Sequence, residues 1–467
     1  MIKVYIDWNV MSGMKSNYFP EFSKLIKRDK FLLVYSSSHI GDIFASYNES
    51  FEQQNVIQQD LDFISELTSD NCIVSCGDKI TIDLYDPSEL MNDRIRESPI
   101  FKDMSIDTLL KSIDLAGNLS NLLSSYFNLL KNLPLDIAFK QAYNNTESAE
   151  ILKNVFPGLE NNLTMEGFFN AFSQMNKDLN EKESYKDIRE IIQKVGVSSG
   201  HFNETKNPFD VIDKAYQKLN IDGFEFRNHF DNSKSVPNWF NEIVNQYLKL
   251  DIHGFKADKV KVSEKGKNTF RNTSEDAFHS GFASRCDFYI TSDDKNYKKT
   301  KAVFEKLQIR TKVLKPNEFI EYFGDDYEKD KFDNHFDLIV QTISTGEFFN
   351  LNYSSGENFG FVHYSDKFFF NFYNKILIPK NKSEGLQFVL SKDHSSDSFY
   401  ILAIKELECL LTIMVNKFGA DYYGKSLYQS GEIEGDNWAG RRWDVGDFSF
   451  RIARLNGWFQ FYFYIIK

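Results

Sequence analysis

The sequence predicts an α/β fold with a mainly parallel sheet, a helical insertion within it, and a separate α+β domain after it. Three observations lead to this prediction. The chain has 467 residues, more than the roughly 100 to 200 residues of one typical domain. Short β-branched and aromatic runs alternate with helical patterns in two blocks, residues 1–90 and 256–328. The pattern changes between the blocks and again after the second one.

The two blocks supply the strands of the parallel sheet. In the first block, IKVYID at 2–7 and FLLVYSS at 31–37 are apolar at consecutive positions, as strands buried on both faces are. A helical pattern follows each of them. In the second block, a helix with the N-cap candidate Ser274 leads into FYIT at 288–291. Another helical pattern connects that strand to TKVLK at 311–315.

The segment 91–255 is expected to be a helical insertion, since 108–133 and 236–250 place apolar residues three and four positions apart. Residues 329–467 have a third pattern. Alternating apolar residues at 359–378 precede one long amphipathic helix at 398–419 and a final aromatic strand pair at 448–467. This mixture predicts a C-terminal α+β domain.

The composition excludes several classes of protein. The net charge is −12 with acids and bases mixed along the chain, which argues against binding nucleic acid through bulk charge. The four cysteines are scattered and lack the spacing of a zinc site, so reduced core thiols are expected. Neither a signal sequence nor about 18 uncharged apolar residues in a row occurs. We therefore expect a cytoplasmic protein that makes no use of a membrane.

Four aspartates are expected at the carboxyl edge of the parallel sheet, where α/β proteins bind ligands. Asp7 ends the first strand and Asp293 follows the strand at 288–291, while Asp42 and Asp276 are expected in the first turns of helices. Each one alone is explained by a turn or a helix dipole. Together, four carboxylates repel one another unless a cation neutralises them. Mg²⁺ or Mn²⁺ is the natural partner of such oxygen ligands.

These motifs resemble those of the PIN-like ribonuclease family, over residues 2–50 and about 268–320. The matching segments are IDWN, the acid of SSSHIGD, and SEDAFHSGFASRCDFYITSDD. In order, the family positions correspond to Asp7 and Asn9 for D-x-N, Asp42 for the second acid, Asp276 for the third, and Thr291 with Asp293 for T-x-D. Asp276, His279 and Ala283 match the D-x-x-H-x-x-x-A pattern of one subset of the family. Four motifs in the family's order make a more specific signal than any one of them.

The resemblance implies a three-layer α/β/α domain and metal-dependent hydrolysis of RNA phosphodiester bonds. The four acids would be the catalytic and metal-binding residues, with Asp42 as a ligand or as the group that orients water. Asn9 and Thr291 would orient the carboxylates or contact a phosphate. We expect His279 to orient Asp276 or to lie in the core, and Asp294 to be a surface or N-cap residue.

The sequence also departs from the family pattern. Trp8 stands where Thr is common, and Asp42 stands where the longer Glu is frequent. The insertion separates motifs that lie closer together in small family members, and the C-terminal domain is no part of the pattern. These departures bear on the choice of substrate more than on the chemistry.

Local basic residues flank the expected acidic edge and offer contacts for a polyanion. They are Lys259, Lys261, Lys265, Lys267 and Lys295. Ordinary solvated lysines explain this pattern equally well. The aromatic run at 368–374 is expected in the core, and RRWD at 441–444 is expected to be a solvated or ion-paired surface segment.

The sequence thus favours a metal-dependent endoribonuclease with Mg²⁺ or Mn²⁺ as cofactor and RNA as substrate, acting as a bacterial toxin or an anti-phage effector. The alternative is a catalytically silent PIN-like module that binds RNA or protein. A regulatory or inhibitory protein partner and a homo-oligomer both fit this role. The RNA target, a DNA substrate, and one metal ion against two stay open.

Overall fold

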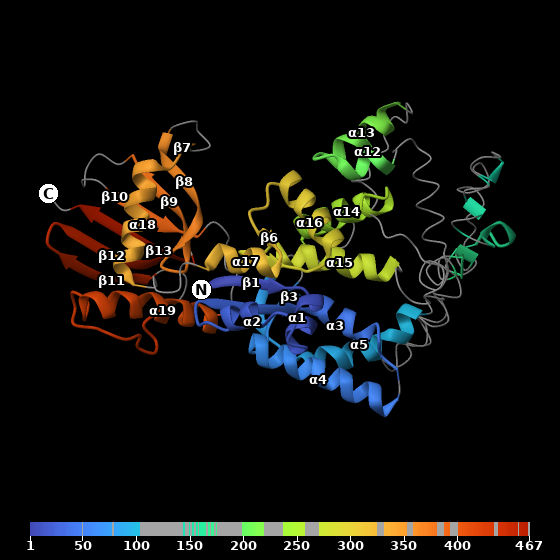
Figure 1. Ribbon diagram of the computed structural model, residues 1–467, viewed down its shortest axis with the longest axis horizontal. Coiled ribbons are helices and arrows are strands. Elements are labelled where there is room, and N and C mark those ends of the chain that lie inside the picture. The colour runs from blue at the N-terminus through green and yellow to red at the C-terminus, as the bar shows by residue number, and fades with distance from the viewer. Residues whose placement is uncertain are drawn as a thin grey trace.

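The structure is a computed structural model. The parts of the chain that it describes are 1–48, 50–76, 79–102, short stretches between 143 and 174, 199–218, 237–256, 270–324, 331–352, 358–380, 387–392, 400–433, 438–455 and 457–465. Within them the chain is mixed α/β, with a mostly parallel six-stranded sheet and an antiparallel seven-stranded sheet. The two sheets lie side by side along the long axis of the molecule (Figure 1).

The first sheet has the strand order β4-β3-β2-β1-β5-β6. Its strands are β1 (Ile2–Ile6), β2 (Phe31–Ser36), β3 (Asn71–Cys76), β4 (Lys79–Leu84), β5 (Phe288–Ile290) and β6 (Lys312–Leu314). All neighbours run parallel except β3 and β4, which are antiparallel. The strands expected at 2–7, 31–37, 288–291 and 311–315 are therefore present, and the insertion between β4 and β5 leaves the sheet continuous.

Helices cover both faces of this sheet, which gives three layers. Along β1, Ile2, Val4 and Ile6 pack into one core with α1, α2, α3, α4 and α17, while Tyr5 packs into the other core with α13, α14, α15 and α16. The bounds are α1 (Trp8–Lys15), α2 (Pro20–Ile26), α3 (Ser37–Phe44), α4 (Phe51–Thr68), α13 (Pro208–Lys218), α14 (Asn238–Ile252), α15 (Phe270–Ala283), α16 (Asp294–Lys306) and α17 (Pro316–Phe323). Alternate side chains of a strand point to opposite faces, so apolar runs suit the middle layer.

The described parts of the expected insertion are mainly helical, although Asn162 and Leu163 are not in a helix and Thr164 forms a β-bridge. α5 (Pro87–Lys102) crosses the expected boundary at 90, and α12 (Ser199–Glu204), α13 and the 3₁₀ helix η1 (Leu159–Asn161) follow. The predicted helix at 236–250 is α14, whereas the stretch 108–133 lies outside the described residues. Phe240 and Tyr247 of α14 are buried in the core beside the sheet. This part of the insertion is therefore integral to the first domain.

The second sheet has the order β11-β12-β13-β10-β9-β8-β7 and forms the expected α+β domain with α18 and α19. The bounds are α18 (Phe332–Thr345), β7 (Phe349–Asn352), β8 (Asn358–Phe369), β9 (Tyr373–Pro379), β10 (Gln387–Ser391), α19 (Tyr400–Phe418), β11 (Trp438–Val445), β12 (Phe448–Leu455) and β13 (Trp458–Ile465). Phe369, Phe370, Phe372 and Tyr373 are buried, which confirms the core prediction for that run.

The two domains contact each other at the amino ends of β1 and β5. Lys392 of the C-terminal domain donates to Oδ2 of Asp287 at 2.8 Å, and both side chains are buried. The same carboxylate oxygen accepts the backbone N–H of Lys3 at 2.7 Å. The aspartates described below lie at the opposite edge of the sheet, at the carboxyl ends of the strands.

Helix hydropathy and the cysteines bear on two further expectations. Among the described helices, none has the length and hydropathy that crossing a bilayer requires. Cys72 and Cys286 are buried thiols as expected, but Cys409 on α19 is exposed, so the prediction of core thiols was wrong for that residue.

Candidate metal centre

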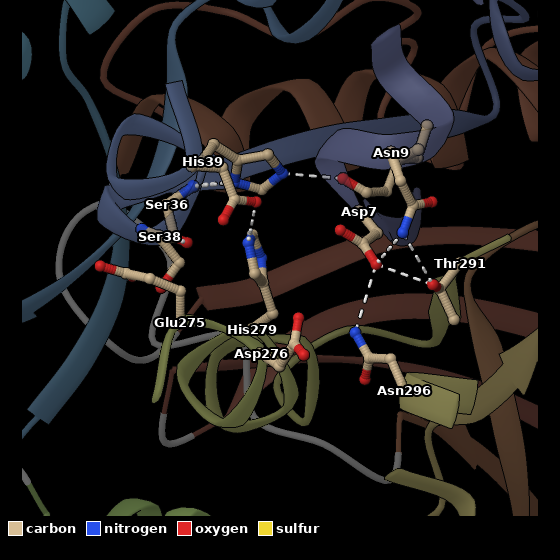
Figure 2. Close-up of polar contacts among 12 residues, drawn as sticks. Asp7, Asn9, Ser36, Ser38, His39, Glu275, Asp276, His279, Thr291 and Asn296 are labelled. Carbon is tan, nitrogen blue, oxygen red and sulfur yellow. Dashed lines mark hydrogen bonds and ion pairs between the residues drawn. The ribbon is translucent and has the colours of Figure 1, made fainter. Parts of the chain in front are cut away.

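Asp7 is the most firmly held of the predicted acids. It follows β1 directly, at the start of α1, and is 3% exposed. Its Oδ2 atom accepts from Asn9 and Thr291 at 2.7 Å each, and from Tyr289 and Asn296 at 3.3 Å each. Figure 2 shows Asn9, Thr291 and Asn296 around this oxygen. The carboxylate is thus fixed through one oxygen, with Oδ1 left to meet a ligand.

Asp42 and His279 complete a cluster with Asp7. Oδ2 of Asp42 lies 3.0 Å from Nε2 of His279, and ligand atoms of all three residues lie within 4.8 Å of one another. The nearby carboxylates raise the pKa of His279 to about 9, although burial acts in the opposite direction. An imidazolium therefore occupies the pocket at neutral pH. Of the two expectations for His279, burial in the core is confirmed, whereas the carboxylate that it contacts is Asp42 and not Asp276.

A chain of buried hydrogen bonds positions His279 through its Nδ1 atom. Its Nδ1 contacts the hydroxyl of Tyr5 at 2.7 Å, and that hydroxyl contacts Oγ of Ser36 at 2.6 Å. Beside it, Nδ1 of His39 accepts the Ser36 N–H at 3.0 Å, so Nε2–H donates to the Ile6 carbonyl at 2.7 Å. Burial and the neighbouring His279 lower the pKa of His39 to about 3. Of this pair of histidines, one is charged and one is neutral.

Asp276 lies beside the cluster on α15 (Figure 2). Burial raises its pKa well above the usual value, and repulsion from Asp7 and Asp42 adds to the effect. Lys299 acts in the opposite direction. The expectation that Asp276 lies in the first turn was wrong, because α15 begins at Phe270, before the proposed cap Ser274. Asp42 is likewise in the second turn, because α3 begins directly after its N-cap Ser36.

Asp293 has a different position from the other acids. It is exposed and is the N-cap of α16, where its Oδ1 accepts from the N–H groups of Lys295 and Asn296 at 2.7 Å each. Its charge nevertheless contributes to the raised pKa values of Asp7 and Asp276. The structure places Asp293 at the rim of the acidic site, outside the group within 4.8 Å.

The remaining predicted residues fall into three groups. Thr291 is buried and Asn9 is exposed, and both bind Asp7, as expected for residues that orient a carboxylate. Asp294 forms an exposed ion pair with Lys315, as a surface residue does. Lys295 follows the cap in the first turn of α16, whereas Lys259, Lys261, Lys265 and Lys267 lie outside the described residues.

Several residues around the site were not predicted from the sequence. Asn296 lies one helical turn after Asp293, a spacing that would have identified it, while Tyr5 and Tyr289 were concealed among strand residues. Glu275 is buried and pairs with Arg94 of α5 at 2.5 Å. The Glu275 carboxylate packs closely against Gly41, where an added Cβ would lie 2.4 Å from it and would require the Glu275 side chain to move.

The insertion also reaches this site through two side chains of α14. Buried Asp251 forms an ion pair with buried Lys299 of α16. The hydroxyl of Tyr247 donates to Oδ1 of Asn296 at 3.5 Å. Lys299 lowers the pKa of Asp276, and Asn296 holds Asp7, so α14 supports the acidic edge from its outer side.

The side chains fit a hard divalent cation. Carboxylate oxygens of Asp7, Asp42 and Asp276 are ligands that Mg²⁺ and Mn²⁺ accept, and an imidazole nitrogen suits Mn²⁺. Burial and mutual repulsion raise the pKa values of Asp7 and Asp276, which means that positive charge is in deficit around them. No family model matches the sequence, and no curated protein or solved structure shows significant similarity to the chain.

Proposed function

We propose that this chain is a metal-dependent endoribonuclease that hydrolyses RNA phosphodiester bonds. The observation that carries the proposal is the cluster of Asp7, Asp42 and His279, with Asp276 beside it, at the carboxyl edge of a parallel sheet. The resemblance of its motifs to the PIN-like ribonuclease family supports the same reaction. A bound Mg²⁺ or Mn²⁺ would supply an acidified water and stabilise charge on the phosphate.

The chain's own residues would prepare the site for this reaction. Asn9, Thr291 and Asn296 hold one oxygen of Asp7 and keep its carboxylate in a single orientation. His279 holds Asp42, and Tyr5 holds His279. Ligands that are oriented by further hydrogen bonds bind metals better than mobile ones. Asp7, Asp42 and Asp276 would bind the ion, and Asp293 would attract it or orient water from the rim.

One observation favours a second candidate, a catalytically silent module that binds RNA or protein. The imidazolium of His279 already compensates part of the negative charge of Asp42 and Asp7. Because the protonated histidine is a cation inside the pocket, less negative charge is left for a metal ion to neutralise. The two candidates differ in whether added Mn²⁺ binds at the acidic edge and produces cleavage.

The test uses purified full-length protein and a fluorescent single-stranded RNA. The nuclease proposal expects cleavage with Mn²⁺ or Mg²⁺, loss of cleavage with EDTA, and loss of cleavage in Asp276→Asn. Calorimetry with Mn²⁺ alone should show one or more bound ions in the wild type and weaker binding in Asp7→Asn. Cleavage that persists in EDTA would contradict the metal mechanism, and metal binding without cleavage would favour the silent module.

We propose a bacterial toxin or anti-phage effector as the cellular role. The support is limited to the sequence pattern of a nuclease with added helical and C-terminal parts. Expression of the wild type should arrest growth of a bacterial host, and Asp276→Asn should abolish the arrest. Equal growth of both strains with equal protein levels would contradict this role.

A further inference from the structure

The C-terminal sheet has two chemically different faces. α18 and α19 pack on one face against phenylalanines such as Phe450, Phe461 and Phe463. Since side chains alternate along a strand, Arg451 and Tyr462 project from the opposite face. Arg442 lies directly across from Arg451, and Arg451 lies across from Tyr462, so the three share that face.

Arginines and tyrosines lie next to one another on this second face, because Arg451 is between Arg442 and Tyr462. The guanidinium of Arg451 lies 6.0 Å from the ring centroid of Tyr462. The rings of Tyr462 and Tyr464 are 6.1 Å apart and inclined by only 8°. Neither tyrosine is fully buried. The face thus offers planar π surfaces next to delocalised positive charge.

A loop after α19 extends the row beyond the sheet edge. The N–H of Tyr422 donates to the carbonyl of Arg442 at 2.7 Å, and the Arg442 guanidinium lies 5.6 Å from the Tyr422 ring centroid. Tyr422 and Tyr423 are 66% and 71% exposed, with their rings edge to face at 5.2 Å. Exposed neighbouring aromatic side chains are costly in water, and they are typical of binding surfaces.

The loop is held rigidly by Arg441, the first arginine of RRWD. Its guanidinium binds Glu432 at 2.5 and 2.8 Å, Asp421 at 3.3 Å and the Leu427 carbonyl at 2.9 Å. Arg441 is 1% exposed, so the expectation of a surface residue was wrong for it, although the Arg442 side chain is 48% exposed. The backbone that carries Tyr422 and Tyr423 is therefore already ordered before a partner binds.

We propose that a strip of Tyr422, Tyr423, Arg442, Arg451, Tyr462 and Tyr464 is a docking platform for single-stranded RNA. Tyrosine rings stack on unpaired bases, and guanidinium groups contact phosphates and stack as well. The strip has a net positive charge that suits a polyanion. It contains two arginines, and the neighbouring Asp444, which pairs with Arg442 at 2.8 Å, compensates only one of them. The platform shares the RNA class with the proposed function, but it lies on the other domain.

Fluorescence anisotropy of a fluorescein-labelled 20-nucleotide oligo(U) tests the platform, with full-length protein in EDTA so that RNA stays intact. Tyr422→Ser with Tyr423→Ser should raise Kd at least about 10-fold, since each stacked base contributes on that order. Arg442→Gln should lower the slope of log Kd against log salt by about one. Tyr18→Ser, at a tyrosine 77% exposed in the first domain, is the matched control and should bind like the wild type. Melting temperatures equal to the wild type confirm folding.

Unchanged Kd in both the double variant and Arg442→Gln would overturn the platform. Binding of duplex RNA as tightly as single-stranded RNA would also overturn it, because paired bases have no free faces. The platform would also be overturned if the double variant no longer bound a protein partner of the wild type but bound RNA with unchanged Kd. The nuclease proposal is scored separately by Mn²⁺-dependent cleavage of a hexanucleotide, which the strip variants should retain. A chain that binds RNA through the strip and never cleaves it would refute only the nuclease.

Discussion

Nε2 of His279 lies 3.0 Å from Oδ2 of Asp42, and this contact builds a positive charge into a pocket of carboxylates. The imidazole is fully buried, and its other nitrogen is held by Tyr5. The carboxylates raise the pKa of His279 from 6.5 to about 9. The metal-free fold therefore depends on a protonated histidine where a cation is expected to bind.

The first prediction concerns pH and His279. A pKa that is higher in the folded state adds stability below the unfolded pKa of 6.5, and this stability is lost as pH rises towards about 9. The full difference corresponds to about 3 kcal/mol. Urea unfolding without metal should show the wild type losing stability across this range. His279→Gln should be less stable at pH 6 and nearly independent of pH, and a parallel decline in both proteins would contradict the prediction.

The second prediction concerns His39 and has the opposite sign. Its pKa is lowered from 6.5 to about 3 in the folded state, so its contribution is present above pH 6.5 and is lost as pH falls. Near pH 5 the wild type should have lost about 2 kcal/mol relative to His39→Gln. Denaturant midpoints of the two proteins at neutral pH and near pH 5 give the comparison. An unchanged difference between them would show that His39 does not titrate on unfolding.

The third prediction concerns Asp276. Removing its charge should stabilise the metal-free protein, because the carboxylate is partly buried and repelled by Asp7 and Asp42. Asp276→Asn should therefore melt at a higher temperature and bind Mn²⁺ more weakly, with at least about a 100-fold loss of cleavage. Asp294→Asn, at an exposed residue, is the control and should change none of these three properties. A lower melting temperature for Asp276→Asn would mean that its carboxylate is structural.

How far the sequence predicts this site depends on the element. Apolar runs predicted β1 and β5, and therefore that Asp7 and Asp293 lie near strand ends at one edge. The helix starts were harder to predict, because α15 begins at Phe270, ahead of the proposed cap Ser274. The capping role of Asp293 was also concealed, since the same side chain suits a cap and a metal ligand.

Pairings between distant segments were beyond the reach of the sequence. Asp251 and Lys299 meet only because α14 packs against α16, and Asp287 meets Lys392 only because the two domains contact each other. Neither pair has a fixed spacing in the chain. Tyr5 was read correctly as a buried strand residue, but its hydroxyl partners come from β2, α3 and α15. Hydrophobic period predicts burial, whereas polar partners depend on tertiary contacts.

The fourth prediction concerns the contact between α14 and α16. Asp251→Asn should destabilise the chain by about 3 to 5 kcal/mol, because it leaves the buried Lys299 without its partner. The double variant Asp251→Leu with Lys299→Met should recover most of this loss, since it removes both buried charges. Denaturant unfolding measures all three. The double variant should still bind Mn²⁺ more weakly than wild type if α14 supports the acidic edge, and normal binding would limit α14 to a packing role.

The last prediction concerns the C-terminal domain and a chain that ends near residue 328. The metal centre lies at the carboxyl ends of β1 and β5, whereas Lys392 binds Asp287 and the Met1 carbonyl at their amino ends. Truncation should therefore leave the acidic cluster assembled. It should lower the melting temperature, because Lys3 and Asp287 become exposed to solvent and Phe288 loses its contact with Phe368.

Two full-length variants separate the ion pair from the apolar contact. Lys392→Met should cost about 3 to 5 kcal/mol by leaving Asp287 buried and unpaired, and adding Asp287→Asn should recover most of that loss. If the truncated chain melts like the full-length protein, the domain contact contributes no stability. If the truncated chain is folded but no longer binds Mn²⁺, the geometry of the acidic cluster at the carboxyl end of β1 depends on the domain contact at the amino end of β1.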